Sequence, residues 1–264
     1  MALLQEKTPI LSIIILNYHT ENLVTDLLKK LGQEEDVEII LVDNNETDKL
    51  HNLVLKDYSY VNYYSLEKNL GFSGGNNLGI SKAKGEWILI LNSDTLVTID
   101  TIKKLIEKTA EQEYLAASPK LIYGNGKIQN NVAYFDSFLR DPINWLLARP
   151  RFLDCSKVLN ETKVNFATAA ALLIHHSVFQ KIGILDDKNF FMYFEDLDLC
   201  QRMHQTGIPI LYIPSISIIH LEGASANQNP TQKKVYYSRG LNNYLRKHRG
   251  IFIEKLNKLF PLFK

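Results

Sequence analysis

The chain has little cysteine and no long apolar run. Its 264 residues include two cysteines, Cys155 and Cys200, which cannot build a disulfide framework and are typical of a reducing compartment. No apolar stretch approaches the roughly 20 residues that a membrane-spanning helix needs. The short run from Ile10 to Leu16 has no basic leader and no small-residue cleavage site after it. We therefore expect no signal peptide, no transmembrane segment and a cytoplasmic protein.

Two phosphate-binding signatures are also missing. The run from Gly71 to Gly79 is rich in glycine but has neither the G-x-G-x-x-G spacing of a dinucleotide site nor the lysine of a Walker motif. Its glycines would let a backbone approach a phosphate closely at the start of a helix. A tight turn before a helix N-cap explains the run as well, and the sequence does not decide between the two.

Charge is unevenly distributed along the chain. The composition is that of an ordinary globular protein, with 45% hydrophobic and 22% charged residues. Residues 231–264 carry nine Lys or Arg against the single Glu254, a net charge of +8, which leaves −7 for residues 1–230 because the whole chain is +1. An acidic body with a basic tail indicates a tail that meets an anionic surface. We do not expect nucleic acid as a partner, because no aromatic platform on the body accompanies the basic residues.

Apolar runs alternate with amphipathic segments through the first half of the chain. This alternation predicts parallel βαβ units and a doubly wound α/β sheet. In such a sheet the ligand lies beyond the carboxyl ends of the strands. Asn17, Asp43, Asn92 and Asp94 all fall at predicted strand ends, so we expect their side chains to lie at one edge. The predicted strands are 13–16, 37–42, 59–65 and 87–91, and the predicted helices are 21–31, 73–84 and 99–111.

The second half of the chain is less regular. Residues 123–163 are rich in turn signals and predict a variable lid or acceptor loop. From Leu241 onward, apolar residues recur at helical spacing with Lys and Arg on the other face, which predicts an amphipathic C-terminal helix. That helix either lies on anionic lipid or packs on the body or across a dimer interface. Further strands are predicted at 167–174, 210–213 and 217–219, and further helices at 177–182 and 195–206.

The densest group of carboxylates follows an aromatic run. Glu195, Asp196 and Asp198 come directly after residues 190–194, where the chain enters a predicted core. Buried carboxylates must be paired, hydrogen-bonded or aimed into a cleft, because burying a free charge is costly. Acidic residues at a helix N-terminus that interact with the helix dipole are the simpler alternative. Successive helical residues point about 100° apart, so Glu195 and Asp196 cannot face one cavity in the same way.

A second acidic site follows the buried run that ends at Leu91. Asn92, Ser93 and Asp94 provide hard oxygen ligands at a strand end, as a divalent metal that bridges a diphosphate requires. The alternative is a helix cap for the segment that begins near residue 98. We favour the metal, because Thr98 could cap that helix without Asp94.

Two other polar residues at strand ends have open roles. Asp43 ends an apolar strand, where a carboxylate either accepts a hydrogen bond from a nucleotide base or ribose or forms an Asx turn. His220 also ends an apolar strand, and a lone histidine in that position is more often structural than catalytic.

Taken together, these segments resemble the family 2 inverting glycosyltransferases with the GT-A fold. The likeness is greatest to the bacterial rhamnosyltransferase-like branch, which builds O-antigens and other cell-surface polysaccharides. It covers about residues 10–225, and no single motif in it is decisive. The segments that carry it follow one another in a specific order: 12–18, 42–45, 69–72 with 75–77, 91–94, 191–200 and 219–220.

The resemblance implies a fold and a set of partners. The fold would be α/β, with a Rossmann-like nucleotide-binding half and an acceptor-binding half on a mixed central sheet. The GT-A domain would cover residues 1–230, with the nucleotide-sugar half at about 1–97 and the acceptor half at 98–230, before a basic amphipathic tail at 231–264. The implied partners are a nucleotide-diphosphate sugar, a glycan or lipid-linked acceptor and a divalent metal, Mg²⁺ or Mn²⁺. Contact with an anionic membrane through 241–264, on the inner face of the cell membrane, and a homodimer stay open.

The resemblance also implies a role for each site residue. Asp196 would be the catalytic base, and Asp94 and His220 would hold the metal or the diphosphate. Glu195 and Asp198 would contact the acceptor or support the site from behind. Asp43 would recognise the base within a nucleotide- and donor-binding set made of Asn17, Asp43, Asn69, Asn76, Asn92 and Ser93.

Two departures from the family pattern bear on the expected activity. Asn92 replaces the first carboxylate of the DxD metal motif, so we expect weak or substrate-dependent metal binding. The stretch from Thr168 to Ala170 replaces a small Gly-Ala pair before the acceptor site.

The expected donor is dTDP-rhamnose. The alternatives are a UDP-sugar transferase for galactose, glucose or N-acetylglucosamine, and a non-catalytic module that binds a sugar nucleotide or glycan.

Overall fold

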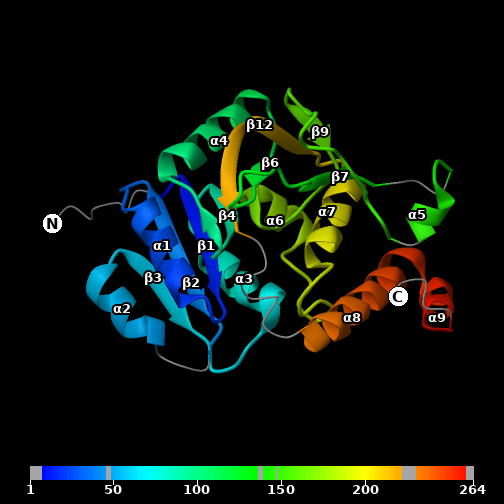
Figure 1. Ribbon diagram of the computed structural model, residues 1–264, viewed down its shortest axis with the longest axis horizontal. Coiled ribbons are helices and arrows are strands. Elements are labelled where there is room, and N and C mark those ends of the chain that lie inside the picture. The colour runs from blue at the N-terminus through cyan, green and yellow to red at the C-terminus, as the bar shows by residue number, and fades with distance from the viewer. Residues whose placement is uncertain (1–7, 46–48, 136–138, 147, 222–229, 260–264) are drawn as a thin grey trace.

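The computed structural model describes residues 8–45, 49–135, 139–146, 148–221 and 230–259. At its centre is a nine-stranded mixed sheet in the order β3-β2-β1-β4-β11-β6-β12-β5, with β9 paired to β12 (Figure 1). A small sheet in the order β10-β7-β8 lies apart from it. Its strands are β7 (Val132–Tyr134), β8 (Arg151–Phe152) and β10 (Phe166–Ala167).

Four parallel strands form the first half of the central sheet. The interiors of β1, β2 and β4 are largely apolar runs that are buried on both faces, as a covered parallel sheet requires, whereas the edge strand β3 is only partly buried. The register pairs Asn17 with Asp43 and Leu16 with Asn92, so these polar residues leave the sheet at one edge. The strands are β1 (Leu11–Asn17), β2 (Val37–Asp43), β3 (Val61–Ser65) and β4 (Trp87–Asn92).

Helices cover both faces of this half. The helices are α1 (Glu21–Leu31), α2 (Lys49–Asp57), α3 (Gly71–Lys82) and α4 (Ile99–Glu111). The helices α1, α2 and α4 pack on the face that buries Ile13 and Ile15, whereas α3 packs on the face that buries Ile14. Gly79 lets α3 approach the sheet, since a Cβ there would lie 2.4 Å from Ile14. Strands, helices and strand ends thus follow the predicted βαβ pattern.

The second half of the sheet mixes strand directions. The strand β11 (Ala171–His175) runs antiparallel to β4 and to β6 (Ala116–Ile122), and β12 (Ile210–His220) runs parallel to β6. Two short strands, β5 (Thr95–Leu96) and β9 (Thr162–Val164), pair antiparallel with β12. The sheet is therefore continuous across the expected division near residue 97, and that division stays a prediction.

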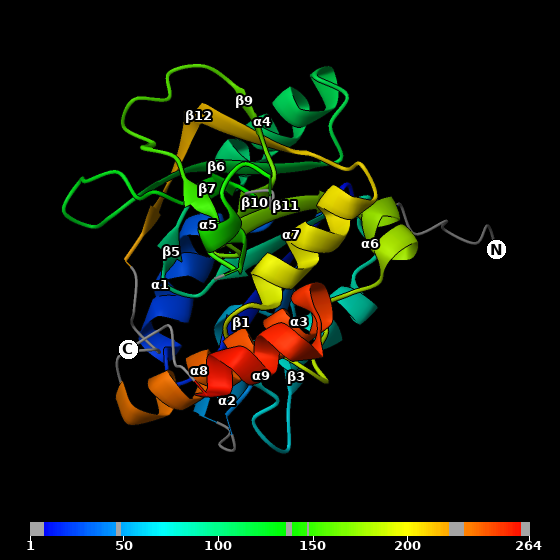
Figure 2. The ribbon, with the colours of Figure 1, turned by 90° about the vertical axis from the view of Figure 1, so that its right-hand side faces the viewer.

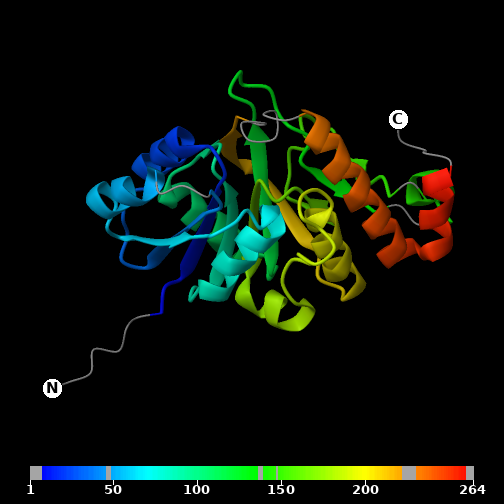
Figure 3. The same cartoon turned by 90° about the horizontal axis from the view of Figure 1, so that it is seen from below.

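Five further helices complete the described chain: α5 (Pro142–Leu146), α6 (His176–Ile182), α7 (Glu195–Gln205), α8 (Pro230–Arg249) and α9 (Ile251–Leu259). The strands of the first half lie at one side of the molecule, and α8 and α9 lie at the opposite side (Figures 1 and 3). Figure 2 shows α8 and α9 side by side below α7. None of the helices within the described ranges is long and apolar enough to cross a membrane.

The C-terminal tail differs from the single predicted helix. Gly250, with φ +95°, separates α8 from α9, because this backbone conformation ends a helix and suits glycine. Leu241, Tyr244 and Leu245 of α8 are buried in the same cluster as the central sheet. The first part of the tail is therefore packed on the body, which is one of the two readings that the sequence left open.

Two predicted strand patterns are also wrong in detail. The predicted strand 167–174 is two strands, β10 and β11, which belong to different sheets. The predicted strands 210–213 and 217–219 are one strand, β12, with a register shift between Ile213 and Ser217. Pairing with distant strands decides where β10, β11 and β12 begin and end, and a local apolar pattern carries no information about that pairing.

Candidate active site

A cavity of about 620 Å³ opens at the carboxyl ends of β1 and β4. It is the site at which a doubly wound sheet binds ligands. Residues from both halves of the chain and from α8 line it. Of the predicted site residues, seven line it, namely Asn69, Asn92, Ser93, Asp94, Glu195, Asp196 and His220. The four that do not line it are Asn17, Asp43, Asn76 and Asp198.

Asn17 and Asp43 form a buried polar pair behind the cavity. Asn17 donates from Nδ2 to Asp43 Oδ1 over 2.9 Å, and Tyr63 donates its hydroxyl to Asp43 Oδ2 over 2.8 Å. The backbone N–H of Asn45 adds a third donor at 3.2 Å. The carboxylate of Asp43 thus has a partner on each oxygen. Asp43 is fully buried and does not line the cavity, so contact with a nucleotide base, the role implied for it, would require the residues around it to move.

Asn44, which we did not single out from the sequence, holds the loop before α3. Its Oδ1 accepts from the N–H of Leu70 over 2.8 Å, and its Nδ2 donates to Asn69 Oδ1 over 2.8 Å. The same Asn69 oxygen accepts from the N–H of Gly71. Asn69 therefore both lines the cavity and fixes the loop. Asn76 lies further along α3, where its Nδ2 donates to the carbonyl of Phe72, and this placement gives no support to a donor-binding role.

Asp94 and His220 come together at a corner of the sheet. The short strand β5 pairs with the end of β12, with Thr95 opposite His220. This pairing places His220 Nε2 3.3 Å from Asp94 Oδ1. On the other side of the ring, Nδ1 lies 2.9 Å from Gln129 Oε1, and Gln129 donates from Nε2 to the carbonyl of His220. Because a glutamine oxygen only accepts, Nδ1 carries the proton, and the ring is held with Nε2 toward Asp94.

Glu195 and Asp196 begin α7 and both line the cavity. Burial, followed by the charge of Asp196, raises the pKa of Glu195 well above its usual range. Burial raises the pKa of Asp196 to about 6. The hydrogen bond that its Oδ1 accepts from the N–H of Leu197 acts in the opposite direction and lowers the pKa, but by less. The two carboxyls differ in surroundings, since Glu195 is buried with Oε2 unpartnered while Asp196 is partly exposed. Their environments therefore suit different roles, as their helical spacing predicts.

The segment that leads into these carboxyls is tightly held. Tyr193 and Phe194 have φ of +69° and +71°, which is rare for aromatic residues and is found where the surroundings impose it. The carbonyl of Phe191 accepts from the N–H of Phe72 over 2.8 Å. Gly71, with φ +73°, lies so close that a Cβ there would be 2.2 Å from the Phe191 carbonyl oxygen. The start of α3 is thus in direct contact with residues 191–194, the segment that leads into Asp196.

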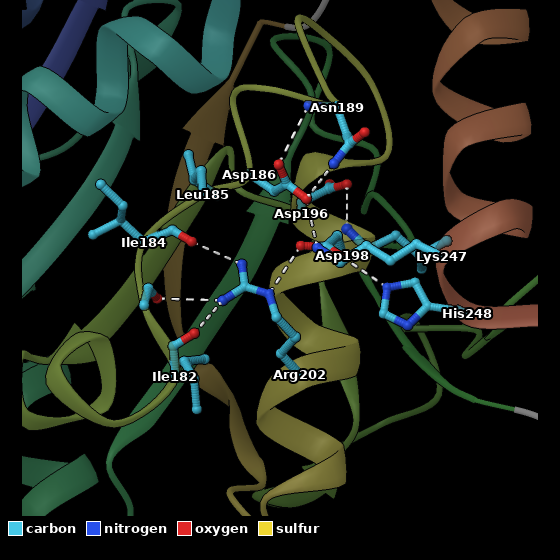
Figure 4. Close-up of polar contacts among 12 residues, drawn as sticks. Ile182, Ile184, Leu185, Asp186, Asn189, Asp196, Asp198, Arg202, Lys247 and His248 are labelled. Atoms are coloured by element: carbon cyan, nitrogen blue, oxygen red, sulfur yellow. Dashed lines mark hydrogen bonds and ion pairs between the residues drawn. The ribbon is translucent and has the colours of Figure 1, made fainter.

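Asp198 faces away from the cavity and binds α8. Its carboxylate accepts from Arg202 Nε at 2.9 Å, Lys247 Nζ at 2.7 Å and His248 Nε2 at 2.7 Å (Figure 4). Burial alone would raise the pKa of Asp198, but hydrogen bonds from His248 and Lys247 and the Arg202 charge lower it to about 2. Asp198 is fully buried and does not line the cavity, so its placement gives no support to direct contact with an acceptor. Its placement favours support from behind the site.

Several solved structures share this fold at identities too low to show more than the fold. A structure of GalNAc-T7 with UDP, GalNAc and Mn²⁺ matches with a TM-score of 0.68 and 18% identity, over 89% of this chain and 47% of that one. The mannosyltransferase PcManGT from Pyrobaculum calidifontis, in complex with GDP-Man and Mn²⁺, matches with a TM-score of 0.60 and 14% identity, over 91% of this chain and 64% of that one. The chain thus spans about half of the first structure and under two thirds of the second. The fold is the GT-A fold of glycosyltransferases.

The family follows from the sequence comparison. The family described as "Glycosyl transferase family 2" matches residues 12–183, and the chain belongs to it. The low-salt glycan biosynthesis hexosyltransferase Agl10 of Haloferax volcanii is 27% identical over 94% of this chain and 78% of its own length. The rhamnosyltransferase WbbL of Escherichia coli is 24% identical over 79% and 82%. The N-acetylglucosaminyl-diphospho-decaprenol L-rhamnosyltransferase of Mycobacterium tuberculosis is 25% identical over 84% and 80%. The protein is a glycosyltransferase, as the sequence predicts.

Proposed function

We propose that the protein is an inverting glycosyltransferase that moves a sugar from a nucleotide-diphosphate donor to a hydroxyl of a glycan acceptor. The reaction would serve the synthesis of cell-surface polysaccharide. The observation that carries the proposal is that one cavity joins Asp196, a carboxyl with a raised pKa, to the Asp94–His220 pair. A base and a diphosphate-binding group in one cavity are what such a transfer requires.

The proposed mechanism is a single in-line displacement. Asp196 accepts the proton of an acceptor hydroxyl, whose oxygen forms a bond to the anomeric carbon. The bond from that carbon to the diphosphate oxygen breaks, and its electron pair leaves with the nucleoside diphosphate. A pKa of about 6 suits Asp196 to this step, because the carboxylate is ionised near neutral pH and is still a stronger base than an ordinary aspartate.

We propose a divalent metal, Mg²⁺ or Mn²⁺, as the cofactor. Asp94 and His220 are the residues that would hold it, and Ser93 lies beside them on the cavity wall. Within the described residues no cluster of three or more His, Cys, Asp or Glu is placed to hold a metal. Two protein ligands still fit a metal that takes its remaining ligands from the donor phosphates. When bound, it would neutralise charge on the leaving diphosphate.

For the donor we propose dTDP-rhamnose. Support comes from the names of the relatives in Escherichia coli and Mycobacterium tuberculosis, both of which are rhamnosyltransferases. The named alternative is a UDP-sugar donor that carries galactose, glucose or N-acetylglucosamine. The Haloferax volcanii relative is named only as a hexosyltransferase, and its name specifies no donor sugar. Its identity to this chain is similar to that of the two rhamnosyltransferases, so a UDP-sugar is kept as the alternative donor. For the acceptor we propose a glycan or a lipid-linked saccharide.

Thermal unfolding of the purified protein with dTDP, UDP and GDP, each with and without Mn²⁺, tests this proposal. A ligand that binds only the native state at a hundredfold excess over its Kd stabilises it by about 2.7 kcal/mol. We expect dTDP to raise Tm most, and Mn²⁺ to enlarge that shift. A larger shift with UDP would move the donor to the alternative class. No shift with any nucleotide would contradict the donor site itself.

Replacing the proposed base tests the mechanism. We expect Asp196→Asn to lower turnover about 10²–10⁴-fold, the usual contribution of a general base, because the amide cannot accept the proton. Donor affinity, measured by titration with dTDP, should stay largely intact. Equal losses of donor binding and turnover would show that Asp196 holds the donor instead of activating the acceptor.

A further inference from the structure

The C-terminal helix α8 reaches into the proposed donor cavity. Gln232, Lys233 and Tyr236, from its first two turns, line the cavity together with Asp94 and Asp196. Among the described residues that line it, Lys233 is the only lysine or arginine. No ion pair or hydrogen bond is recorded for the ammonium group of Lys233 within the part of the chain that the structure describes. A cation in this position is available to a ligand that enters the cavity.

Contacts along the whole of α8 fix this position. The ring of Tyr236 packs against Phe191 with the ring centroids 4.8 Å apart. Further along, a Cβ at Gly240 would lie 2.7 Å from the carbonyl oxygen of Tyr193, so the backbones of α8 and of this segment approach closely. At the far end, Lys247 and His248 bind the buried Asp198 of α7 (Figure 4). Lys233 therefore projects from a helix anchored to the element that carries the proposed base, and not from a free tail.

Lys233 can balance the negative charge of a ligand in the cavity. The other titratable groups on its wall include the carboxyls Asp94, Glu195 and Asp196. A nucleoside diphosphate brings further negative charge, which must be balanced when its phosphates are partly desolvated. Lys233 supplies a fixed positive charge on the same wall.

We propose that Lys233 binds the diphosphate of the donor and stays with the nucleoside diphosphate as it leaves. This inference rests on the proposed function and extends it, because it makes the C-terminal helix part of the donor site. As the bond from the anomeric carbon to the diphosphate oxygen breaks, the electron pair passes to that oxygen, and the ammonium group of Lys233 stabilises the added charge. The proton of the acceptor hydroxyl goes to Asp196, and Lys233 takes no part in that transfer.

Its neighbour Lys234 offers a matched control. Lys234 is also exposed, but it lines an open hollow between α8 and α9 and not the donor cavity. The variants Lys233→Met and Lys234→Met therefore remove the same charge from adjacent positions on one helix. General electrostatic attraction by the basic helix would be weakened equally by both changes, whereas direct contact with the diphosphate depends on Lys233 alone.

The experiment compares the affinity of each variant for dTDP and for thymidine, by calorimetric titration, with the wild type. Losing one charge-assisted contact to a phosphate should weaken dTDP binding by Lys233→Met about tenfold or more. Thymidine binding should stay within about twofold, since it has no phosphate, and Lys234→Met should bind both ligands like the wild type. We also expect Lys233→Arg to restore most of the dTDP affinity.

Three outcomes would overturn the inference. These are unchanged dTDP binding by Lys233→Met, an equal loss in Lys234→Met, and an equal loss of thymidine and dTDP binding, which would indicate a displaced helix. In all three the wild type still binds dTDP, so the proposed function stands. If the wild type binds none of dTDP, UDP and GDP, the proposed function fails, and the inference fails with it.

Discussion

At the scale of single residues, the site depends on the contrast between two neighbouring carboxyls. Asp196 is partly exposed and has a pKa of about 6, whereas Glu195 is buried with one oxygen unpartnered and a pKa well above its usual range. Two titratable groups whose environments set their pKa values apart are typical of acid–base sites. Burial, and after it the negative charge of Asp196, raises the pKa of Glu195 and so favours its protonated form.

The raised pKa predicts the acidic limb of the pH profile. Asp196 acts as a base only when ionised, so kcat/KM should rise with pH up to an apparent pKa of about 6 and then level off. Below that value we expect a fall of about tenfold per pH unit. Initial rates at low donor and acceptor concentrations between pH 4.5 and 8 measure it. A flat profile down to pH 4.5 would contradict the assignment of Asp196 as the base.

A glutamine at the neighbouring position is the control for that profile. Burial raises the pKa of Glu195 well above its usual range, and Glu195→Gln removes that titration while keeping the size and polarity of the side chain. The acidic limb should therefore stay near its wild-type position. If the limb disappears in Glu195→Gln, it reports the titration of Glu195, and the roles of the two carboxyls must be exchanged.

At the scale of the elements, the sequence predicts local patterns well and long-range pairing poorly. The helices α1 and α4 match their predicted bounds, because each has an amphipathic stripe with a clear end signal. For α1 this signal is Gly32 after its last residue, and for α4 it is Thr98 before its first residue, whose side chain accepts from the N–H of Thr101.

The strand β6 was not predicted, because Pro119 and Lys120 interrupt its apolar run. Pairing with β11 and β12 creates that strand, and the register shift in β12 follows the pair formed with Pro119, which has no N–H to donate.

The same difference explains what could be foreseen of the site. The sequence correctly predicts that Asn92 and Asp94 lie at the edge of the sheet, because an apolar run followed by polar residues is a local signal for the end of a strand. The meeting of Asp94 with His220 depends on the pairing of β5 with β12, so only the family resemblance pointed to it. Lys233 looked like any other basic residue of the tail, because nothing near it in sequence shows that α8 returns to the cavity.

The close approach of α3 to the segment before α7 can be tested with two glycines. Gly32 and Gly71 both have positive φ, but a Cβ at Gly32 meets nothing within 4 Å, whereas one at Gly71 would lie 2.2 Å from the Phe191 carbonyl oxygen. We expect Gly32→Ala to cost about 2 kcal/mol of unfolding free energy from backbone strain alone, because φ +69° with ψ −158° is a conformation essentially confined to glycine. Gly71→Ala should cost about 3 kcal/mol, since overpacking adds to the same strain.

Activity separates these two variants further. A shift of the segment before α7 moves Asp196, and a displacement of about 1 Å can cost about a hundredfold in rate. We therefore expect Gly71→Ala to lose at least about tenfold in kcat, while Gly32→Ala keeps nearly wild-type kcat. Urea unfolding and initial rates measure the two effects. Equal kcat values in the two variants would show that the start of α3 does not position the base.

At the scale of the whole molecule, Asp198 joins α7 to α8 and makes stability depend on pH. Its folded pKa of about 2 lies below the ordinary value of 3.8, so the ionised form stabilises the fold above about pH 4, and this contribution is lost as the pH falls toward 2. A shift of this size corresponds to about 2 kcal/mol. Asp198→Asn should lose at least that much unfolding free energy near neutral pH.

The pH series carries the control for this prediction. Urea unfolding near neutral pH and near pH 2.5 should show a smaller difference between Asp198→Asn and the wild type at the acidic pH, since the wild type has by then lost part of the contribution. Asp100→Asn is the matched comparison, because Asp100 also pairs with a lysine but is exposed, and exposed pairs contribute little. A loss in Asp198→Asn no larger than in Asp100→Asn would mean that the contact between α7 and α8 does not depend on this carboxylate.

Membrane contact is the remaining proposal at this scale, and the fold restricts where it can occur. The apolar residues Leu241, Tyr244 and Leu245 of α8 are buried in the body, so deleting the tail would open the core and would not report on lipid. On α9, however, Ile251 and Phe252 are 59% and 74% exposed. With Lys255 of the same helix, which is also exposed, they suit contact with anionic lipid, with about 1 kcal/mol expected from each Lys or Arg near the membrane.

The double variant Ile251→Ser/Phe252→Ser tests this surface without touching the core. We expect the wild type to co-sediment with anionic phospholipid vesicles and to lose this binding in neutral vesicles, because the attraction is largely electrostatic. The double variant should bind anionic vesicles markedly less, since its exposed apolar side chains no longer enter the interface. Leu55→Ser is the control, because Leu55 is 60% exposed on α2, away from the tail. Equal sedimentation of the double variant and the wild type would mean that α9 does not contact lipid, and an acceptor held in a membrane would then have to reach the cavity by another face.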